Sequence, residues 1–242
     1  MIKQQLIHSD YQPLANEIER YFAQSSTILQ DDRNTIKEVV FNNETLVVKS
    51  YKRLGWFRGL IYTYWKKSKA WRAYEYGLKI AKFTPKVVAR IENFEPLLTK
   101  NYLICCKFEA DFNMQAPLFK NHPNKQTIFK EFTKFVYQLH QNNILHQDLS
   151  PGNILIKKNQ QDYEFKIIDI NRMHFKTLSL KERAKNFNKL WANDDDLALI
   201  LRTYAKLADL DVDYFVNLGL GYNQQNKTRK IRKRKIKKML GL

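Results

Sequence analysis

Three polar side chains in the second half of the chain have types and a spacing that suit phosphoryl transfer. Asp148 and Asn153 lie in the segment His-Gln-Asp-Leu-Ser-Pro-Gly-Asn, and Asp169 ends the run Phe-Lys-Ile-Ile-Asp. Catalysis of this reaction consists mainly of positioning an acceptor hydroxyl and neutralising phosphate charge with metal ions. A carboxylate at position 148 can accept the proton of that hydroxyl, and the oxygens of Asn153 and Asp169 are ligands that magnesium prefers. The sequence therefore predicts Asp148 as the catalytic base and Asn153 and Asp169 as magnesium ligands in a nucleotide-binding site.

The apolar residues around these side chains predict the elements that position them. A short strand ends at His146, a second strand and a hairpin follow Asn153, and a third strand ends at Asp169. The polar residues alone are only suggestive, but the flanking Ile-Leu-His and Asn-Ile-Leu-Ile runs make the pattern specific. The segment resembles the catalytic loop of a kinase fold. In kinases this histidine packs and forms hydrogen bonds, so we expect a structural role for His146.

Upstream of this loop, the pattern predicts a small sheet and one long helix. Strands are expected at residues 27–30, 36–41, 45–51, 86–91 and 102–108, and the helix at residues 62–82. Lys49 lies in Leu-Val-Val-Lys, the pattern of the kinase strand whose lysine holds nucleotide phosphates. Glu75 is the only acidic residue between positions 45 and 91, so it is the candidate partner that fixes the Lys49 side chain. We predict that both residues place ATP, the alternative being two solvated surface charges.

Downstream, a helix is expected at residues 125–141, because its apolar residues recur with helical spacing. Ser179 and Glu182 form a capping-box pattern for a further helix, and Asn193 or Asp194 is placed to cap the next.

These elements predict an α+β fold of the two-lobed, protein-kinase-like type, in one domain that covers residues 1–242. The expected parts are an N-lobe with a small antiparallel sheet (residues 25–108), a polar hinge (109–124), a mainly helical, shortened C-lobe (125–226) and a basic C-terminal tail (227–242). Residues 1–24 contain an amphipathic stretch to which the sequence assigns no role.

The formal net charge of +18 is the outlying feature of the composition. It implies an anionic partner: a phosphate-bearing substrate, an acidic membrane surface or nucleic acid. Nucleic acid is disfavoured because no aromatic residues interleave the charges after position 227. No apolar run approaches the roughly 18 residues that span a bilayer, and the N-terminus lacks the apolar region of a signal peptide. We therefore expect a cytoplasmic protein that touches a membrane only peripherally.

Several features depart from regulated protein kinases. No glycine precedes Gly55, so the Gly-rich loop that covers ATP phosphates is missing, and Gln147 and Ser150 replace an arginine and a lysine of the protein-kinase loop. Asp169 is not followed by Phe-Gly. These differences favour a compact kinase for small molecules or sugars.

At this point the chain resembles the lipopolysaccharide kinase family, the Kdo and heptose kinases of the inner core. The resemblance rests on residues of the region 30–192: Arg33-Asn34, Val47-Val-Lys49, Ser68-Lys-Ala-x-Arg72 with Glu75, Thr84-Pro85, the segment from His146 to Asn153, and Asp169-Ile-Asn-Arg172. It implies that ATP and Mg²⁺ are cofactors, that Asp148 is the base and that Lys49 with Glu75 places ATP. It also implies a lipid A-linked sugar as acceptor, and Kdo is favoured over heptose. The basic face and tail would then hold the enzyme on the anionic inner face of the cytoplasmic membrane.

Three other functions stay open at this stage. One is an atypical small protein kinase, which the compact size and basic charge favour. Another is a pseudokinase that binds an anionic partner without catalysis, because the Gly-rich loop is absent. The last is a kinase for an aminoglycoside or another metabolite. The sequence makes no prediction of oligomeric state.

Overall fold

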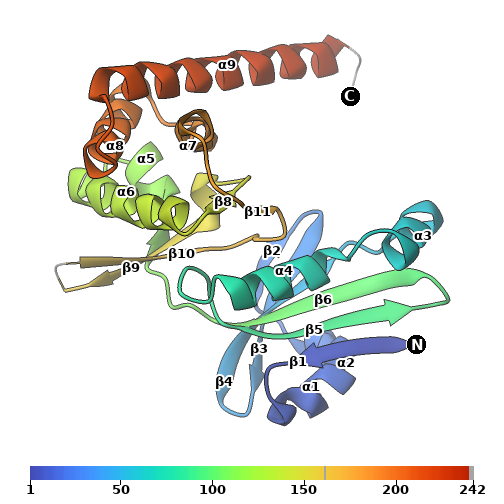
Figure 1. The fold of residues 1–242 in the computed structure, drawn as a ribbon. Helices are drawn as coiled ribbons and strands as arrows, with labels where there is room; N and C mark the ends of the chain where they lie inside the picture. The colour runs from blue at the N-terminus through green and yellow to red at the C-terminus, as the bar shows by residue number, and fades with distance from the viewer. Residues whose placement is uncertain (161, 240–242) are drawn as a thin grey trace. The chain divides into compact units, whose positions relative to one another are not determined.

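The computed structural model describes residues 1–160 and 162–239, and the chain divides into two compact units (Figure 1). The first unit contains Met1–Glu109 and the short segment Asp169–Arg172. The second contains Ala110–Ile168 and the chain from Met173 onward. Asp169 and Asp148, the two candidate carboxylates, therefore belong to different units.

A six-stranded antiparallel sheet forms the centre of the first unit, in the order β1-β5-β6-β4-β3-β2. Its strands are β1 Ile2–Leu6, β2 Ile28–Asp31, β3 Asn34–Phe41, β4 Glu44–Tyr51, β5 Val87–Phe94 and β6 Leu98–Cys106. The five strands expected from the sequence are all present. The unassigned N-terminal stretch adds β1 to the edge beside β5, together with the short helices α1 Gln12–Asn16 and α2 Ile18–Gln24.

Strand β4 has a different role on each face of this sheet. Leu46 and Val48 are fully buried in a core with Leu14 and Ile18 of the N-terminal helices. Because successive side chains in a strand point to opposite faces, Lys49 points to the other face. Tyr51 shares that face with Lys49.

The prediction of one long helix at residues 62–82 is wrong, because the structure has two helices in this region. They are α3 Trp56–Tyr64 and α4 Lys69–Lys79. The Ser68 hydroxyl accepts a hydrogen bond from the Trp71 amide (2.9 Å) and so begins α4. A second amide in the first turn of α4, that of Ala70, donates to the buried side-chain oxygen of Asn101 on β6 at 3.3 Å.

The second unit contains most of the helices. α6 Lys125–Gln141 has the predicted bounds, and its apolar stripe is buried. Two small sheets follow, with orders β10-β9-β7 and β11-β8. Their strands are β7 Phe112–Asn113, β8 Ile144–His146, β9 Ile154–Asn159, β10 Asp162–Ile167 and β11 Met173–Phe175. The connection expected at residues 109–124 thus contributes a strand, β7, and a short helix, α5 Gln115–Phe119.

The remaining helices are α7 Leu180–Asn186, α8 Asp194–Leu207 and α9 Val212–Met239, with the 3₁₀ turn η3 Phe187–Lys189 between α7 and α8. The capping box of Ser179 and Glu182 is confirmed, and Asn193 caps α8. Much of the expected basic tail belongs to α9, which runs beside α7 and α8 (Figure 1). No described helix combines the length and the apolar character that a membrane span needs.

Candidate functional site

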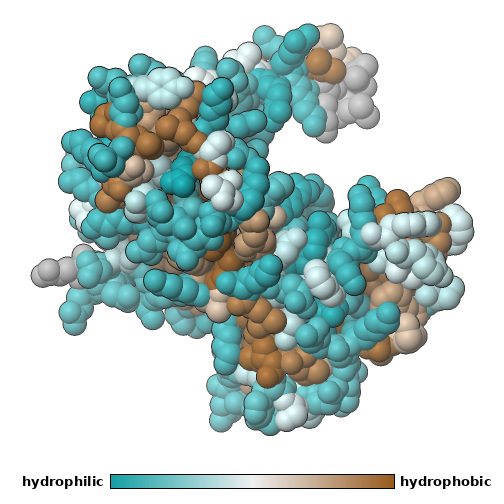
Figure 2. Space-filling view, in the orientation of Figure 1, coloured by the Kyte–Doolittle hydropathy of each residue, from teal (hydrophilic) through white to brown (hydrophobic). Residues whose placement is uncertain are grey.

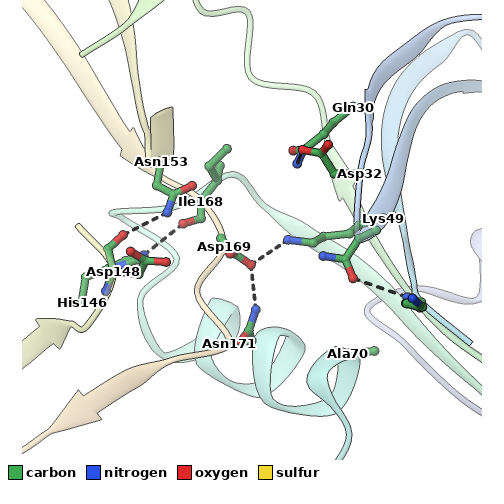
Figure 3. Close-up of polar contacts among 12 residues, drawn as sticks. Gln30, Asp32, Lys49, Ala70, His146, Asp148, Asn153, Ile168, Asp169 and Asn171 are labelled. Atoms are coloured by element: carbon green, nitrogen blue, oxygen red, sulfur yellow. Dashed lines mark hydrogen bonds and ion pairs between the residues drawn. The ribbon is translucent and has the colours of Figure 1, made fainter. Parts of the chain in front are cut away.

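Lys49 and Asp169 form an ion pair within the first unit. The Lys49 Nζ lies 2.6 Å from the Asp169 Oδ1 (Figure 3). Strand β4 lies between β3 and β6, so the backbone of Lys49 is fixed on both sides. Only 13% of the Lys49 side chain is exposed, against 35% for Asp169, so the lysine ammonium is largely sheltered from solvent screening.

The backbone of Asp169 has an unusual conformation that the neighbouring residues stabilise. Its φ of 57° lies in the left-handed region, which aspartate tolerates better than most residues. The Asn171 Nδ2 donates a second hydrogen bond to the same Oδ1 at 2.7 Å. The following residue, Ile170, is buried beside Gly77 of α4, where an added Cβ would lie 3.4 Å from the Ile170 Cδ1. Packing and two donors together fix the Asp169 carboxylate.

Further cations surround this pair, and the sequence analysis assigned no role to them. The pKa of Lys69 is lowered, first by burial and then by the positive charge of Arg172; Lys49 and Arg33 lower it further, and Asp169 partly offsets them. Lys49 and Lys69 also lie over the ring of Tyr51, with Nζ-to-centroid distances of 5.4 and 5.9 Å. A group of cations around one carboxylate creates a positive potential that favours phosphate.

A basic pocket of about 280 Å³ lies in the same unit. Arg33, Lys52, Arg53 and Lys100 line it together with Asp32 and several uncharged residues. Arg33 therefore contributes both to the pocket and to the electrostatic environment of Lys69. The pocket is suited to an anionic group.

The expected pairing of Lys49 with Glu75 is not found among the described residues. Glu75 lies on α4 and is half-buried, but the salt bridge of Lys49 is made to Asp169. In kinases, this lysine pairs with the glutamate only when the helix that carries the glutamate is correctly placed. A role of Glu75 in placing ATP thus stays a prediction.

The β2–β3 hairpin occupies the place of a Gly-rich loop in the chain order, and its own side chains shape its turn. Thr35 Oγ1 donates to Asp31 Oδ1 at 2.8 Å, and Gln30 Nε2 donates to Asp32 Oδ2 at 3.2 Å. The turn is therefore held by hydrogen bonds and not by glycine geometry.

In the second unit, His146 links the predicted catalytic loop to the strand end at Ile168. Its Nδ1 accepts a hydrogen bond from the Asp148 amide at 3.0 Å, so its Nε2 carries the proton and donates to the Ile168 carbonyl at 3.0 Å (Figure 3). Both ring nitrogens of the neutral imidazole are thus used. These two contacts give His146 the structural role that was expected of it.

Asn153 closes the loop around Asp148. Its Nδ2 donates to the Asp148 carbonyl at 2.9 Å, and the Ser150 amide donates to the same oxygen at 2.7 Å. With the amide nitrogen used, the Asn153 Oδ1 is the atom left for a metal ligand. The Asp148 carboxylate accepts no hydrogen bond from the residues that the structure describes. It is thereby suited to receive a proton from a substrate hydroxyl.

A buried chain of hydrogen bonds that the sequence did not predict supports this loop. Asn186 Nδ2 donates to the His146 carbonyl at 2.8 Å, which leaves its Oδ1 to accept from His140 Nε2 at 3.1 Å. The hydroxyl of Tyr204 then donates to His140 Nδ1 at 2.8 Å. Burial lowers the pKa of His140 to about 4, so the ring is neutral at physiological pH. The partners lie 40 or more positions apart, so no local pattern could reveal them.

Helix α9 adds a cation near the proposed base. Lys230 lies 4.0 Å above the ring of Trp191, and its pKa is lowered mainly by burial while the negative charge of Asp148 opposes the shift. Lys230 therefore belongs to the electrostatic environment of Asp148.

Asp169 and Asn153, the expected magnesium ligands, belong to different units. Among the described residues, no group of three or more His, Cys, Asp or Glu side chains could hold a metal ion. Magnesium in phosphoryl-transfer sites uses one or two protein ligands and completes its shell with phosphate oxygens and water. The Asp169 carboxylate and the Asn153 amide oxygen are ligands of that kind.

Comparison with known proteins gives a family match and a fold match. The model of the lipopolysaccharide kinase (Kdo/WaaP) family matches residues 82–209. Two curated proteins, the mitogen-activated protein kinases spm1 of Cytospora mali and mpkA of Aspergillus fumigatus, are each 26% identical over 134 residues. These matches cover 51% of this chain but only 29% of either relative.

Among solved structures, WaaP in complex with acyl carrier protein is similar over 95% of this chain and 98% of that chain, with a TM-score of 0.63. At 13% identity the likeness concerns the fold alone. It confirms the predicted α+β, protein-kinase-like fold.

Proposed function

Because the chain belongs to the lipopolysaccharide kinase (Kdo/WaaP) family, we propose that it transfers a phosphate from ATP to a sugar hydroxyl of the lipopolysaccharide inner core. Kdo linked to lipid A is the proposed acceptor, and heptose is the second choice. The single observation that carries the proposal is the partly buried Lys49–Asp169 pair, in a unit where further cations surround one carboxylate.

Each unit supplies its own groups to the proposed reaction. Lys49 and Lys69 bind phosphate oxygens of ATP, and Glu75 would pair with Lys49 once the Asp169 carboxylate served as a magnesium ligand. Asp169 and Asn153 each supply an oxygen ligand to magnesium, which neutralises phosphate charge when it is bound. Asp148 orients the acceptor hydroxyl and takes its proton.

The acceptor proposal also has electrostatic support. A lipid A-linked sugar carries phosphates and carboxylates and lies in a membrane leaflet. The net charge of +18 favours encounter with such a surface, and the basic pocket that contains Arg33 suits an anionic substituent of the acceptor. We propose that the protein works at the inner face of the cytoplasmic membrane.

Transfer of the terminal phosphate of ATP to purified Kdo-linked lipid A, with and without magnesium, tests the proposal. Asp148→Asn should abolish most of the transfer but keep ATP binding, because it removes the proton acceptor and keeps the shape. Asp195→Asn is the matched control, since Asp195 is an exposed acid on α8. Equal transfer by the Asp148→Asn variant and the unaltered protein would refute the assigned base.

A protein acceptor is the second candidate, because the curated relatives that match are protein kinases. Transfer to added protein, with none to Kdo-lipid A or heptose acceptors, would select it. Thermal stability that does not respond to ATP with magnesium would instead favour a pseudokinase.

A further inference from the structure

Helix α3 exposes its hydrophobic side chains to solvent. The exposed fractions are 66% for Trp56, 76% for Phe57, 40% for Ile61, 69% for Tyr64 and 71% for Trp65, which follows the helix. Positions 57, 61, 64 and 65 recur with helical spacing, so these side chains share one face. An amphipathic helix of a soluble unit normally buries this face, and α3 does the opposite.

Close packing of the other face keeps α3 in this orientation. A Cβ on Gly59 would lie 3.0 Å from the Leu98 carbonyl oxygen, so the helix backbone lies directly against β6. The Thr63 hydroxyl donates to the Gly59 carbonyl at 2.7 Å and accepts from the Leu98 amide at 2.9 Å. The helix cannot turn its aromatic face inward without breaking these contacts.

Basic residues surround the aromatic face. Arg58 lies on the helix, Lys66 and Lys67 follow it, and all three are exposed. No acidic residue occurs between positions 45 and 74. In the region where Figure 1 draws α3, the surface in Figure 2 carries brown and pale side chains with few strongly hydrophilic ones among them. Trp and Tyr with Lys and Arg are the residues that anchor helices in the headgroup layer of membranes.

We propose that α3 with Trp65, Lys66 and Lys67 inserts into the surface of an anionic lipid bilayer. Phe57, Tyr64 and Trp65 enter the boundary between headgroups and acyl chains, and the cations bind lipid phosphates. The 9 residues of α3 are far fewer than the roughly 20 that cross a bilayer, so the helix lies in the interface. The absence of acidic residues between positions 45 and 74, with the exposed Glu95 of the adjoining β5–β6 turn paired to Arg53, favours an anionic bilayer over a protein partner with a mixed surface. This proposal extends the function proposed above, but vesicle binding requires no phosphoryl transfer, so either can fail alone.

Cosedimentation with vesicles is the first test. The full chain is mixed with vesicles of phosphatidylcholine alone, or of phosphatidylcholine with phosphatidylglycerol. The double variant Phe57→Ser, Trp65→Ser should lose affinity for the anionic vesicles by roughly tenfold or more, because two large apolar groups no longer leave water. The control is Tyr214→Ser, an aromatic residue on α9 that is 54% exposed and has the acidic residues Asp211 and Asp213 nearby in the chain. It should bind as the unaltered protein does.

Tryptophan fluorescence supplies the second measurement. Lipids brominated on their acyl chains should quench the emission of the unaltered protein, and the quenching should fall sharply in Trp56→Phe, Trp65→Phe. The variant Lys66→Gln, Lys67→Gln should weaken binding to anionic vesicles with a smaller salt dependence. Absence of vesicle binding, equal binding by the Phe57→Ser, Trp65→Ser variant, or self-association through this face without vesicle binding would each overturn the proposal.

Discussion

Gly77→Ala is a sharp test of how tightly α4 packs against the sheet. A Cβ at this position would lie 2.3 Å from the Val87 Cγ1 and 3.3 Å from its Cγ2. Val87 is itself buried and β-branched, so it has little freedom to move aside. Alanine in a helix interior is normally favoured over glycine by about 1 kcal/mol. Overpacking of a core costs about 1–3 kcal/mol, so the net effect should be a destabilisation of about 0–2 kcal/mol.

Gly221→Ala is the matched control, because nothing lies within 4 Å of a Cβ added at this position in α9. It should gain the helix preference without the clash, which stabilises the chain by about 1 kcal/mol. The difference between the two variants isolates the overpacking cost of about 1–3 kcal/mol. For a chain of 242 residues, that difference corresponds to melting temperatures that differ by roughly 2–12 °C.

Thermal unfolding followed by circular dichroism measures this difference. In a Val87→Ala background the clash is removed, so the further change Gly77→Ala should lose most of its penalty. A Gly77→Ala variant that melts as high as Gly221→Ala would show that α4 and β5 do not pack as closely as described. Because Ile170 also lies beside Gly77, the same variant should show less stabilisation by ATP with magnesium.

Three further predictions concern the second unit. Ser179→Ala removes the hydroxyl that accepts from the Glu182 amide, so it should cost about 1 kcal/mol and lower the melting temperature by roughly 2–4 °C, whereas Ser179→Asp should keep the cap. The depressed pKa of His140, from 6.5 to about 4, means that between these values the unfolded chain binds a proton that the native chain does not. Stability should therefore fall as pH drops through this window, by up to about 3 kcal/mol, and urea unfolding of His140→Gln should lack that component. Asn186→Leu removes the donor to the His146 carbonyl, so kcat should fall roughly 10- to 100-fold with little change in KM for ATP; an unchanged kcat would deny Asn186 a role in positioning Asp148.

Local patterns were sufficient where a structural feature depends on neighbours in the chain. The strands on either side of Asp148 and Asn153, the α6 helix and the cap at Ser179 follow from patterns of neighbouring residues, and these elements match the prediction. The break between α3 and α4 was missed because Lys66 and Lys67, which lie at the break, are good helix formers, so helix propensity does not mark it. Its signal was Ser68, a good N-cap residue placed directly before Lys69.

The partner of Lys49 could not be predicted in the same way. Glu75 was chosen because it is the only acid in its region of the chain, but the carboxylate that contacts Lys49 is 120 positions away. Asp169 was predicted as a metal ligand, and nothing in the sequence indicates that its carboxylate contacts Lys49. Which cation contacts the Asp169 carboxylate depends on the tertiary packing of Ile170 against Gly77, and no short-range sequence pattern encodes that packing.

The net charge of +18 does not by itself show which anions the protein binds, because that depends on where the charges lie. Lys49 and Lys69 belong to a partly buried group with Asp169, where exclusion of water strengthens electrostatic attraction. Lys66 and Lys67 are exposed beside an aromatic helix, where salt largely screens attraction beyond a Debye length of about 8 Å at physiological ionic strength. Raising the salt concentration should therefore weaken attachment through α3 far more than phosphate binding at Lys49. The two proposals thus assign one excess of positive charge to two kinds of anion, a nucleotide phosphate and a lipid surface, and the difference in salt dependence tests that assignment.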